Sequence, residues 1–386
     1  MIVTFLSNFY NHHQAPFSEI MAEKLNGGYA FIATEKMSSE RLSMGWGNEP
    51  TPNFVHNYEE EKEWCDDRIN KSDVVIIGSA PYELIKNRLK NGQLTFLYSE
   101  RIFRKEPSFL KLLKYKFTHH RMFGRFKSIY LLCASAFAYR DYVRMMSFRD
   151  KAFKWGYFPR TYTYEDFDQI IKNKEKPAVS LLYVSRMIEL KHPELPVFVA
   201  ERLKEEGIHF TLTMVGNGVI KNDILKMVRE KRLEKEIVFI DCLRPEEVRK
   251  QMLLSDIFLF TSDRNEGWGA VLNEAMNSCC AVVASSAIGS VPFLLKNGEN
   301  GFVFKDGCFE DLYKKTKELC IDKELRQKMS LNAYKTIVDM WCAEKAAERL
   351  IQLCDDISKG IPTSRFNDGV CSKAEDLADN WFGRGK

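Results

Sequence analysis

The sequence lacks the features that would place it across a membrane or outside the cell. No apolar run reaches the roughly 18 residues that a bilayer-spanning helix needs. Residues 1–7 have no charged stretch ahead of their apolar residues, so we do not expect a signal peptide. The ten cysteines form no C-x-x-C pair and no regular spacing. They are typical of reduced core thiols in a cytoplasmic protein, not of disulfides or zinc ligands.

Length and composition indicate a globular chain with more than one core. A chain of 386 residues is too long for one ordinary core and predicts two domains. A hydrophobic content of 45% with 28% charged residues is typical of folded rather than disordered proteins. No repeat of solenoid period is evident in the sequence.

Short apolar runs recur along the chain, with helical stretches between them. Because these runs are continuous rather than alternating, we expect strands that are buried on both faces of a parallel sheet. The pattern predicts an α/β protein with two doubly wound, Rossmann-like domains. The runs in the first half are 2–6, 29–33, 74–77, 94–98 and 130–133, and those in the second half are 179–184, 210–215, 237–240, 257–260 and 281–284.

The same patterns suggest where the domains begin and end. We expect an N-terminal domain over 1–163 and a C-terminal domain over 178–335, joined by the polar, charged linker 164–177. The helical pattern predicts a long helix between residues 330 and 355. In the division into domains, residues 336–357 are assigned to this terminal helix. The tail 358–386 contains Gly360, Pro362 and Gly369 and is predicted to be irregular.

One stretch, Glu266-Gly-Trp-Gly-Ala-Val-Leu-Asn-Glu274, has the context of a ligand site. An apolar run of strand length precedes it at 256–263, and a helix pattern begins at 270. A strand, a glycine turn and a helix N-terminus together offer free backbone N–H groups and a positive dipole end to an anion. The spacing alone is not specific, because Glu310 and Glu318 repeat it in an ordinary solvated helix. The preceding strand, Gly267 and Gly269 distinguish the first pair.

Several other segments follow in an order that resembles a known family. A strand with Arg186 and Lys191 after it spans 181–192, a glycine turn lies at 213–218, and further turns lie at 289–292 and 296–303. The chain resembles the retaining family-4 glycosyltransferases of the GT-B fold, whose signature is Glu-x7-Glu after such a strand. The resemblance is specific over about residues 178–350. Residues 11–14, with Pro16-Phe17, are similar to a bacterial branch that builds capsular or other surface polysaccharides.

The resemblance implies a fold and a reaction. It implies two domains that face each other across a cleft, with the terminal helix crossing back to the N-terminal domain. It also implies a donor site without a metal ion or cofactor, in which Arg186 and Lys191 hold the diphosphate. Both residues follow a strand at the carboxyl edge, where α/β sheets bind ligands. Asp241, Asp256 and Asp263 do not form an Asp-x-Asp metal site.

Further donor contacts come from the same resemblance. Glu274 would accept hydrogen bonds from the ribose hydroxyls and Glu266 would contact the hydroxyls of the donor sugar. Trp268 would pack over the sugar or, equally, in the core. The remaining positions would contribute mainly backbone groups. Near the sugar and phosphate these are Gly267, Gly269 and Ala270, and near the nucleoside they are Gly216, Asn217 and Leu243.

The N-terminal domain departs from the family pattern. Many members have a His-Asp pair after the strand at 94–98, where this chain has Ser99, Glu100 and Arg101. Glu100 is a candidate for acceptor contact or base assistance, and a salt bridge is the alternative. His13 follows the first strand and is a candidate for an acid–base or sugar-binding role, favoured slightly over His12.

Positive charge is concentrated in one block of the chain. Residues 86–160 contain nine lysines and nine arginines against four acidic residues, although the whole chain has a net charge of only +4. Within this block, 103–117 interleaves cations with phenylalanine and leucine, as expected for a helix on an anionic membrane surface. A core helix with a solvated basic face and a nucleic-acid groove are the alternatives, and we favour the membrane.

Three functional classes fit these observations. The first is a retaining, metal-independent hexosyltransferase that uses a nucleotide-diphosphate sugar, with UDP-sugar favoured, and a glycan or lipid-linked glycan as acceptor. It would act in the cytoplasm at the inner face of the cell membrane and bind no nucleic acid. The second is a nucleotide-sugar epimerase of the same fold, and the third is a non-catalytic sugar-nucleotide-binding protein. The joint presence of Arg186, Lys191, Glu266 and Glu274 favours the first class.

Overall fold

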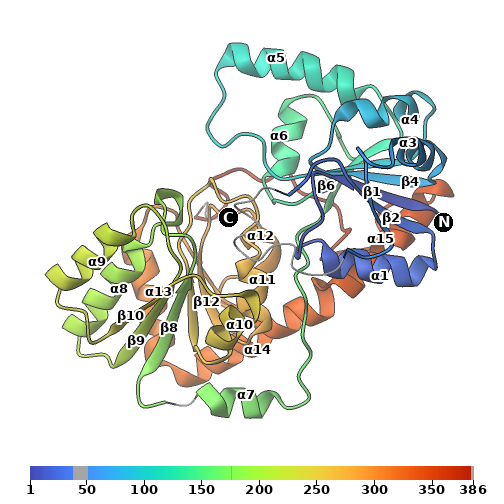
Figure 1. Cartoon of the computed structure of the whole chain (residues 1–386). Coiled ribbons are helices and arrows are strands. Elements are labelled where there is room, and N and C mark those ends of the chain that lie inside the picture. The colour runs from blue at the N-terminus through green and yellow to red at the C-terminus, as the bar shows by residue number, and fades with distance from the viewer. Residues whose placement is uncertain (38–50, 175, 384–386) are drawn as a thin grey trace. The chain divides into compact units, whose positions relative to one another are not determined.

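A computed structural model describes residues 1–37, 51–174 and 176–383, which form two units. The first unit comprises Met1–Arg160 and Trp341–Ala378, and the second comprises Thr161–Met340 and the described residues from Asp379 onward. The chain therefore passes from one unit to the other after Arg160, after Met340 and after Ala378. Each unit is an α/β sandwich built on one parallel sheet (Figure 1).

The first unit contains a seven-stranded sheet in the order β3-β2-β1-β4-β5-β6-β7. Every neighbouring pair of strands is parallel. Its strands are β1 (Val3–Ser7), β2 (Tyr29–Ala33), β3 (Val55–Asn57), β4 (Val74–Ile77), β5 (Thr95–Ser99), β6 (Ile129–Cys133) and β7 (Ala152–Lys154). Its helices are α1 (Ala15–Leu25), α3 (Lys62–Lys71), α4 (Lys86–Lys90), α5 (Phe109–His119), α6 (Ala138–Arg144) and α15 (Ala343–Ser358).

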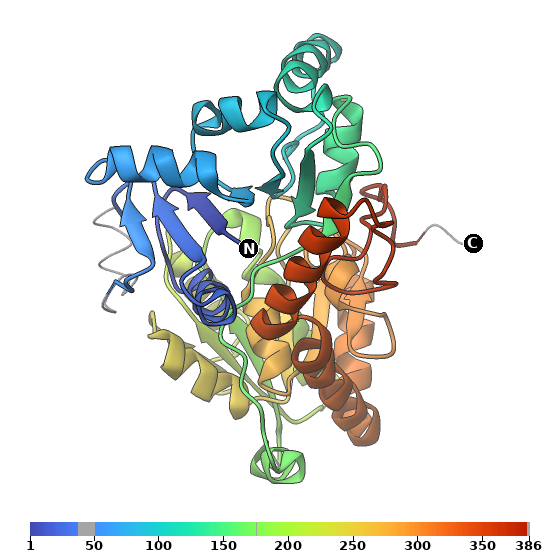
Figure 2. The same cartoon turned by 90° about the vertical axis from the view of Figure 1, so that its right-hand side faces the viewer.

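Helices cover both faces of this sheet. Helices α1 and α15 lie side by side under one face, and α3 and α4 lie over the other (Figures 1 and 2). The strands β1 and β4 are buried along almost their whole length, which explains their continuous apolar runs. The order of strands reverses between β1 and β4, so the loops after these strands diverge at the carboxyl edge.

The second unit contains a six-stranded parallel sheet in the order β10-β9-β8-β11-β12-β13. Its strands are β8 (Val179–Val184), β9 (Phe210–Val215), β10 (Ile237–Ile240), β11 (Ile257–Phe260), β12 (Ala281–Ser285) and β13 (Phe302–Phe304). Its helices are α7 (Phe167–Lys174), α8 (Glu194–Glu205), α9 (Lys221–Glu230), α10 (Pro245–Leu253), α11 (Val271–Asn277), α12 (Val291–Leu294), α13 (Phe309–Ile321) and α14 (Lys323–Met340).

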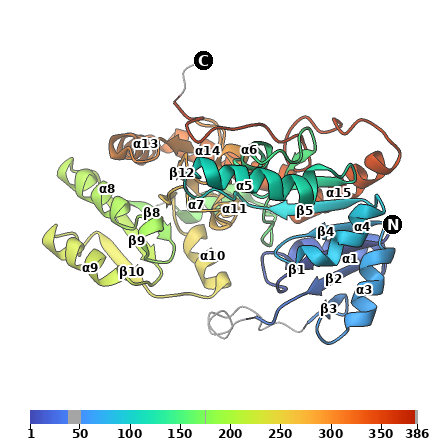
Figure 3. The ribbon, with the colours of Figure 1, turned by 90° about the horizontal axis from the view of Figure 1, so that it is seen from above.

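The helices of the second unit also form two layers. Helices α8, α9 and α13 cover one face of the sheet, and α10, α11 and α14 cover the other (Figures 1 and 3). Buried apolar side chains of β8, β9, β11 and β12 pack against α8, α9 and α13 in one continuous core. The two doubly wound, parallel sheets confirm the α/β fold class predicted from the sequence.

Two segments differ from the prediction. The single helix expected between 330 and 355 is two helices, because α14 ends at Met340 and α15 begins at Ala343. Trp341 and Cys342 between them are buried, and the chain changes unit at this break. The expected linker 164–177 contains α7, which belongs to the second unit. Residue 175 of that linker and residues 384–386 of the expected tail lie outside the described residues.

Helix α5 differs from the other helices of its unit because none of its residues is buried. It stands apart from the sheet (Figures 1 and 2). Phe109, Leu110 and Phe117 are 74%, 78% and 70% exposed, and Leu113 on the same face is 45% exposed. Across the residues that the structure describes, no helix combines the length and the apolarity that a bilayer-spanning helix requires.

Candidate functional site

The second unit brings the predicted donor residues together at one edge of its sheet. Strands β8 and β11 are neighbours, and the strand order reverses between them. Ligands of open α/β sheets bind at the carboxyl ends of strands at such a reversal. Arg186 and Lys191 follow β8, and Glu266 follows β11. The sequence therefore folds so that groups 75 residues apart meet at the reversal.

Lys191 and Glu266 form an ion pair between Nζ and Oε2. Both side chains are only 13% exposed, so water screens this pair weakly. The two loops that carry the pair are fastened to each other by backbone and side-chain hydrogen bonds. The N–H of Asp263 donates to the carbonyl of Leu190 at 3.0 Å, and the hydroxyl of Thr261 donates to the carbonyl of Lys191 at 2.9 Å. The position of Lys191 relative to Glu266 is thus fixed by the loops.

Arg186 is exposed at the end of the same strand. Within the described part of the chain, its guanidinium makes no hydrogen bond or ion pair. An exposed guanidinium presents several N–H donors in a planar arrangement that matches phosphate oxygens. The edge therefore presents one cation that is already paired and one that faces solvent.

Two glycines let backbone segments approach closely at this edge. Gly216 follows β9 with a φ of +135°, and a Cβ there would lie 2.0 Å from the carbonyl oxygen of Ser185. Gly269 has a φ of +79°, and a Cβ there would lie 2.4 Å from Phe260. Any larger residue would push the loop after β9 away from Ser185, or the turn before α11 away from β11. These contacts explain the glycines on structural grounds alone.

Glu274 lies in the first turn of α11 and is partly buried. Loss of hydration raises the pKa of its carboxyl from 4.5 to about 7, although Arg249 lowers it. Arg249 is held in place by the ring of Tyr162, 3.4 Å from its guanidinium carbon, and by Asn277 Oδ1 at 3.3 Å. Sequence reasoning did not identify Arg249, because α10 and α11 meet only in the folded chain.

The other predicted donor positions are distributed around this edge. The side chain of Trp268 is fully buried and its Nε1–H donates to Asn273 Oδ1 at 2.9 Å. The structure therefore places this side chain in the core. Gly267 is buried and Ala270 partly buried before α11, while Asn217 is exposed after β9. Leu243 is partly buried after β10, next to Cys242, which is the one exposed thiol of the ten.

The first unit holds the two candidates that the sequence suggested for the acceptor side. Glu100 follows β5 and accepts hydrogen bonds from Tyr157 at 3.0 Å and from Arg104 at 2.8 Å. His13 packs against Tyr157 with 5.7 Å between ring centroids, so Tyr157 lies between the two candidates. Burial and the neighbouring His12 lower the pKa of His13 to about 3, which makes its imidazole neutral at pH 7. Sequence reasoning missed Tyr157.

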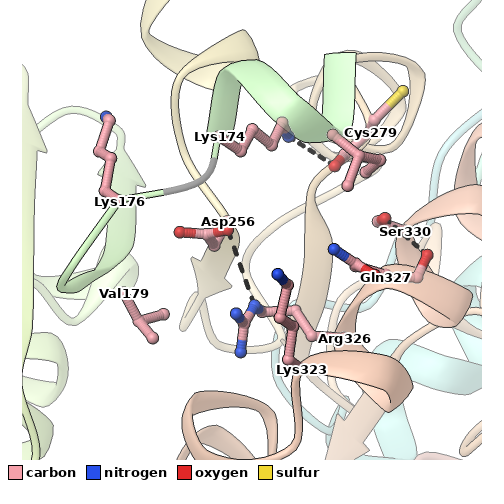
Figure 4. Close-up of a pocket in the computed structure, with 10 residues that line it drawn as sticks. Lys174, Lys176, Val179, Asp256, Cys279, Lys323, Arg326, Gln327 and Ser330 are labelled. Carbon is pink, nitrogen blue, oxygen red and sulfur yellow. Dashed lines mark hydrogen bonds and ion pairs between the residues drawn. The ribbon is translucent and has the colours of Figure 1, made fainter. Parts of the chain in front are cut away.

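A cavity of about 90 Å³ lies at the opposite edge of the second sheet (Figure 4). Val179 at the start of β8 and Asp256 just before β11 line it, together with several cations. Lys174 Nζ donates to the carbonyls of Ser255 and Cys279, and Arg326 lies 3.6 Å from Asp256. These partners explain the cations as supports for α7 and α14, so we do not assign a ligand to this cavity.

Comparison with known proteins finds a family match over part of the chain. Residues 164–336 match the family described as "Glycosyl transferases group 1". A capsular polysaccharide biosynthesis glycosyltransferase, CapH, of Staphylococcus aureus is 32% identical over 174 residues, which cover 43% of this chain and 45% of CapH. A Campylobacter jejuni 4-alpha-N-acetylgalactosaminyltransferase, whose name specifies a diphospho-undecaprenol-linked saccharide, is 26% identical over 147 residues, or 38% of this chain and 39% of that protein. The chain thus spans less than half the length of either relative.

The likeness to solved structures extends over both units. HepE of Anabaena, solved in complex with UDP, superposes on this chain with a TM-score of 0.66 at 14% sequence identity. The match covers 92% of this chain and 100% of HepE. Such a likeness establishes the fold, and the fold is GT-B. The structure also collects Arg186, Lys191, Glu266 and Glu274 inside the segment that matches the family. Residues 164–336, which hold the candidate donor site, are therefore similar to the glycosyl transferases group 1 family.

Proposed function

We propose that the chain is a retaining, metal-independent glycosyltransferase that moves a sugar from a UDP-sugar to a hydroxyl of a glycan acceptor. The observation that carries the proposal is the meeting of Arg186, Lys191 and Glu266 at the strand reversal, with Glu274 in the adjoining helix. HepE, a protein of the same fold, binds UDP, which favours a uridine nucleotide. The relatives named for capsule and undecaprenol-linked products favour a surface-polysaccharide acceptor.

The chemistry assigned to these groups follows from charge. When the bond between the sugar C1 and the diphosphate oxygen breaks, negative charge develops on the leaving group. Two fixed cations, Arg186 and Lys191, stabilise that charge without a metal ion. The acceptor oxygen forms its bond to C1 on the same face, and its proton passes to the leaving phosphate oxygen. Configuration at C1 is then retained.

The ion pair of Lys191 and Glu266 offers the donor two groups at once. When Lys191 turns to the diphosphate, Glu266 loses its partner and becomes free to accept hydrogen bonds from the sugar hydroxyls. Glu274, at the start of α11, accepts from the ribose hydroxyls in its ionised form. In the first unit, we propose that Glu100 and His13 contact the acceptor. His13 acts there as a neutral imidazole because of its low pKa.

The test of this proposal is release of UDP from a donor, measured with and without an acceptor. Wild-type protein is incubated with UDP-glucose, UDP-N-acetylglucosamine, GDP-mannose or ADP-glucose. Release of the nucleoside diphosphate and the anomeric configuration of the product are measured. We expect acceptor-dependent release from a UDP-sugar with retained configuration. A product with inverted configuration at C1 would exclude retention. Conversion of the sugar without transfer to the acceptor would support the epimerase alternative.

We also propose that α5 docks the protein on the cytoplasmic face of an anionic membrane. Its exposed apolar residues Phe109, Leu110, Leu113 and Phe117 lie within one face of the helix. Lys114 borders one side of this face and Lys116 the other, at helical spacing. An exposed apolar stripe between cations is the arrangement that lies in the interface of an anionic leaflet. Such a position would serve an undecaprenol-linked acceptor.

Vesicle co-sedimentation tests this second proposal. The substitution of Lys111, Lys114 and Lys116 by Glu should release the protein from vesicles that contain anionic lipid, with UDP binding retained. The substitution of Lys226, Lys235 and Lys314 by Glu changes the charge equally at exposed positions of the second unit and should leave vesicle binding intact. Each cation near such a leaflet contributes about 1 kcal/mol, screened by salt. Equal loss in both variants, or no binding at low salt, would exclude docking through α5.

A further inference from the structure

Residues 379–382 return to the second unit and pack on two loops of its carboxyl edge. The carboxylate of Asp379 pairs with Arg264 at 3.2 Å. Two residues further on, Trp381 donates its Nε1–H to the carbonyl of Ser286 at 2.9 Å. The ring of Phe382 lies 4.9 Å from Lys315 Nζ. Four consecutive residues thus supply two contacts to loops at the carboxyl edge of the sheet and one contact to α13.

The loop that Asp379 holds is the one that carries Glu266. Arg264 lies two residues before Glu266, in a turn closed by the Glu266 N–H, which donates to the carbonyl of Asp263 at 3.0 Å. Asn265 N–H donates to the Asp263 carboxylate at 2.7 Å in the same turn. On its inner side the turn is fastened to the Lys191 loop through the Asp263 N–H. The Asp379 carboxylate adds a second fastening through Arg264.

The loop that Trp381 holds lies next to it along the sheet. Ser286 directly follows β12, the neighbour of β11, and is buried. Its hydroxyl accepts from the N–H of Asp306 at 3.1 Å, and its carbonyl accepts from Trp381. A buried carbonyl that lost this donor would lose a hydrogen bond that water replaces poorly. Trp381 therefore stabilises the loop after β12 as Asp379 stabilises the loop after β11.

We propose that Asp379 is a positioning residue for Glu266 and fixes the turn 263–266 in the arrangement that receives the donor sugar, and that Trp381 supports it by anchoring the segment 379–382 that carries Asp379. The role of Glu266 in this statement rests on the proposed function, whereas the fastening of the turn does not. Positioning of this kind affects binding of the donor sugar. It leaves the proposed nucleoside contacts unaffected, because these lie at Glu274 and in the loops after β9 and β10. The predicted signature is weaker binding of UDP-sugar with unchanged binding of UDP.

The chain supplies a matched control three residues earlier. Asp376 pairs with Arg140 of the first unit at 2.9 Å, and its side chain is 51% exposed, against 48% for Asp379. Asp376→Asn and Asp379→Asn thus remove equivalent ion pairs from neighbouring positions, but only the second pair reaches the Glu266 turn. Trp381→Phe removes the indole N–H and keeps an aromatic ring.

Hydrogen–deuterium exchange on the full chain without ligand is the first test. In Asp379→Asn and Trp381→Phe, peptides that cover residues 263–266 should exchange up to about fivefold faster than in wild type, the range of a half-exposed ion pair. Asp376→Asn should match wild type in these peptides, and Asp379→Glu should restore slow exchange. Unchanged exchange in both Asp379→Asn and Trp381→Phe would overturn the proposal.

The second test compares affinities for UDP and for UDP-glucose or UDP-N-acetylglucosamine by calorimetry. We expect Asp379→Asn to weaken sugar-nucleotide binding several-fold with UDP affinity unchanged. Equal weakening for UDP and UDP-sugar would overturn positioning of Glu266 and indicate a general loss of loop structure. If the wild-type protein binds neither ligand, the proposed function fails, and the exchange experiment still decides whether residues 379–382 fasten the turn.

Discussion

The chain contains two Glu-x7-Glu pairs that share a spacing and differ in their surroundings. Glu266 and Glu274 lie at the carboxyl edge of a parallel sheet, beside a paired lysine and a buried turn. Glu310 and Glu318 lie on the exposed face of α13, where Glu310 pairs with Arg202 at 3.1 Å. The second pair is exposed to solvent, whereas partial burial raises the pKa of Glu274. The spacing thus marks a site only where the fold removes water from it.

The largest expected effect separates the lysines that accompany the two pairs. Lys191→Ala and Arg186→Ala should each lower kcat about 10²–10³-fold, the usual loss when one group that stabilises developing charge is removed. Lys314→Ala, between Glu310 and Glu318, should leave kcat at the wild-type value because this side chain is exposed. Steady-state rates of UDP release measure all three variants. Wild-type turnover in Lys191→Ala would contradict the donor site.

A smaller effect is expected when the second glutamate of each pair is changed. Glu274→Gln should weaken UDP binding about 10–100-fold, because a hydrogen bond to a charged group contributes about 1.5–3 kcal/mol. Glu318→Gln should bind UDP as wild type does. Calorimetric titration of both variants gives the comparison directly, and equal affinities would show that Glu274 has no role in nucleotide binding.

The pH dependence of nucleotide binding should distinguish the pairs further. The pKa of Glu274 in the free protein is about 7, and ribose hydroxyls require the carboxylate, so affinity for UDP should rise as pH increases from 6 to 8. Below pH 7 the expected change approaches tenfold per pH unit. The neutral form favours the folded state, so this group's contribution to stability is present below its unfolded pKa and is lost as pH rises through 7. Glu274→Gln should flatten both profiles, whereas Glu318→Gln should leave them unchanged.

The smallest expected effect is that of chelation. Because Arg186 and Lys191 supply the positive charge for the diphosphate, EDTA should leave initial rates nearly unchanged. Loss of activity in EDTA that Mg²⁺ or Mn²⁺ restores would show that the two cations do not suffice.

The sequence predicted the inner strands of both sheets and missed three others. Buried parallel strands such as β4 and β11 are continuous apolar runs, which are visible without any tertiary information. The missed strands β3, β7 and β13 are edge strands of three residues each, too short to form a pattern. The break between α14 and α15 was missed for a related reason, since helical character continues on both sides of Trp341.

The site was predictable to the extent that it follows strand ends. Arg186, Lys191 and Glu266 come directly after apolar runs, and the parallel sheet brings such positions to one edge. The positions of Arg249, Tyr157 and Asp379 result from contacts between distant segments, so no local sequence pattern predicts them. Trp268 shows the converse, because an aromatic residue inside a glycine turn is equally compatible with a ligand and with the core.

The distribution of thiols gives the protein a natural site for chemical labelling. Eight of the ten cysteines are buried and Cys308 is partly covered, while Cys242 is exposed. Burial also raises the pKa of the thiols of Cys279 and Cys320 to about 12, which suppresses their reactive thiolate. A maleimide dye should therefore attach to Cys242 of the unaltered chain, one residue from Leu243. A fluorophore at that position would lie beside Leu243, one of the proposed nucleoside contacts, and would test for nucleotide binding without any substitution in the chain.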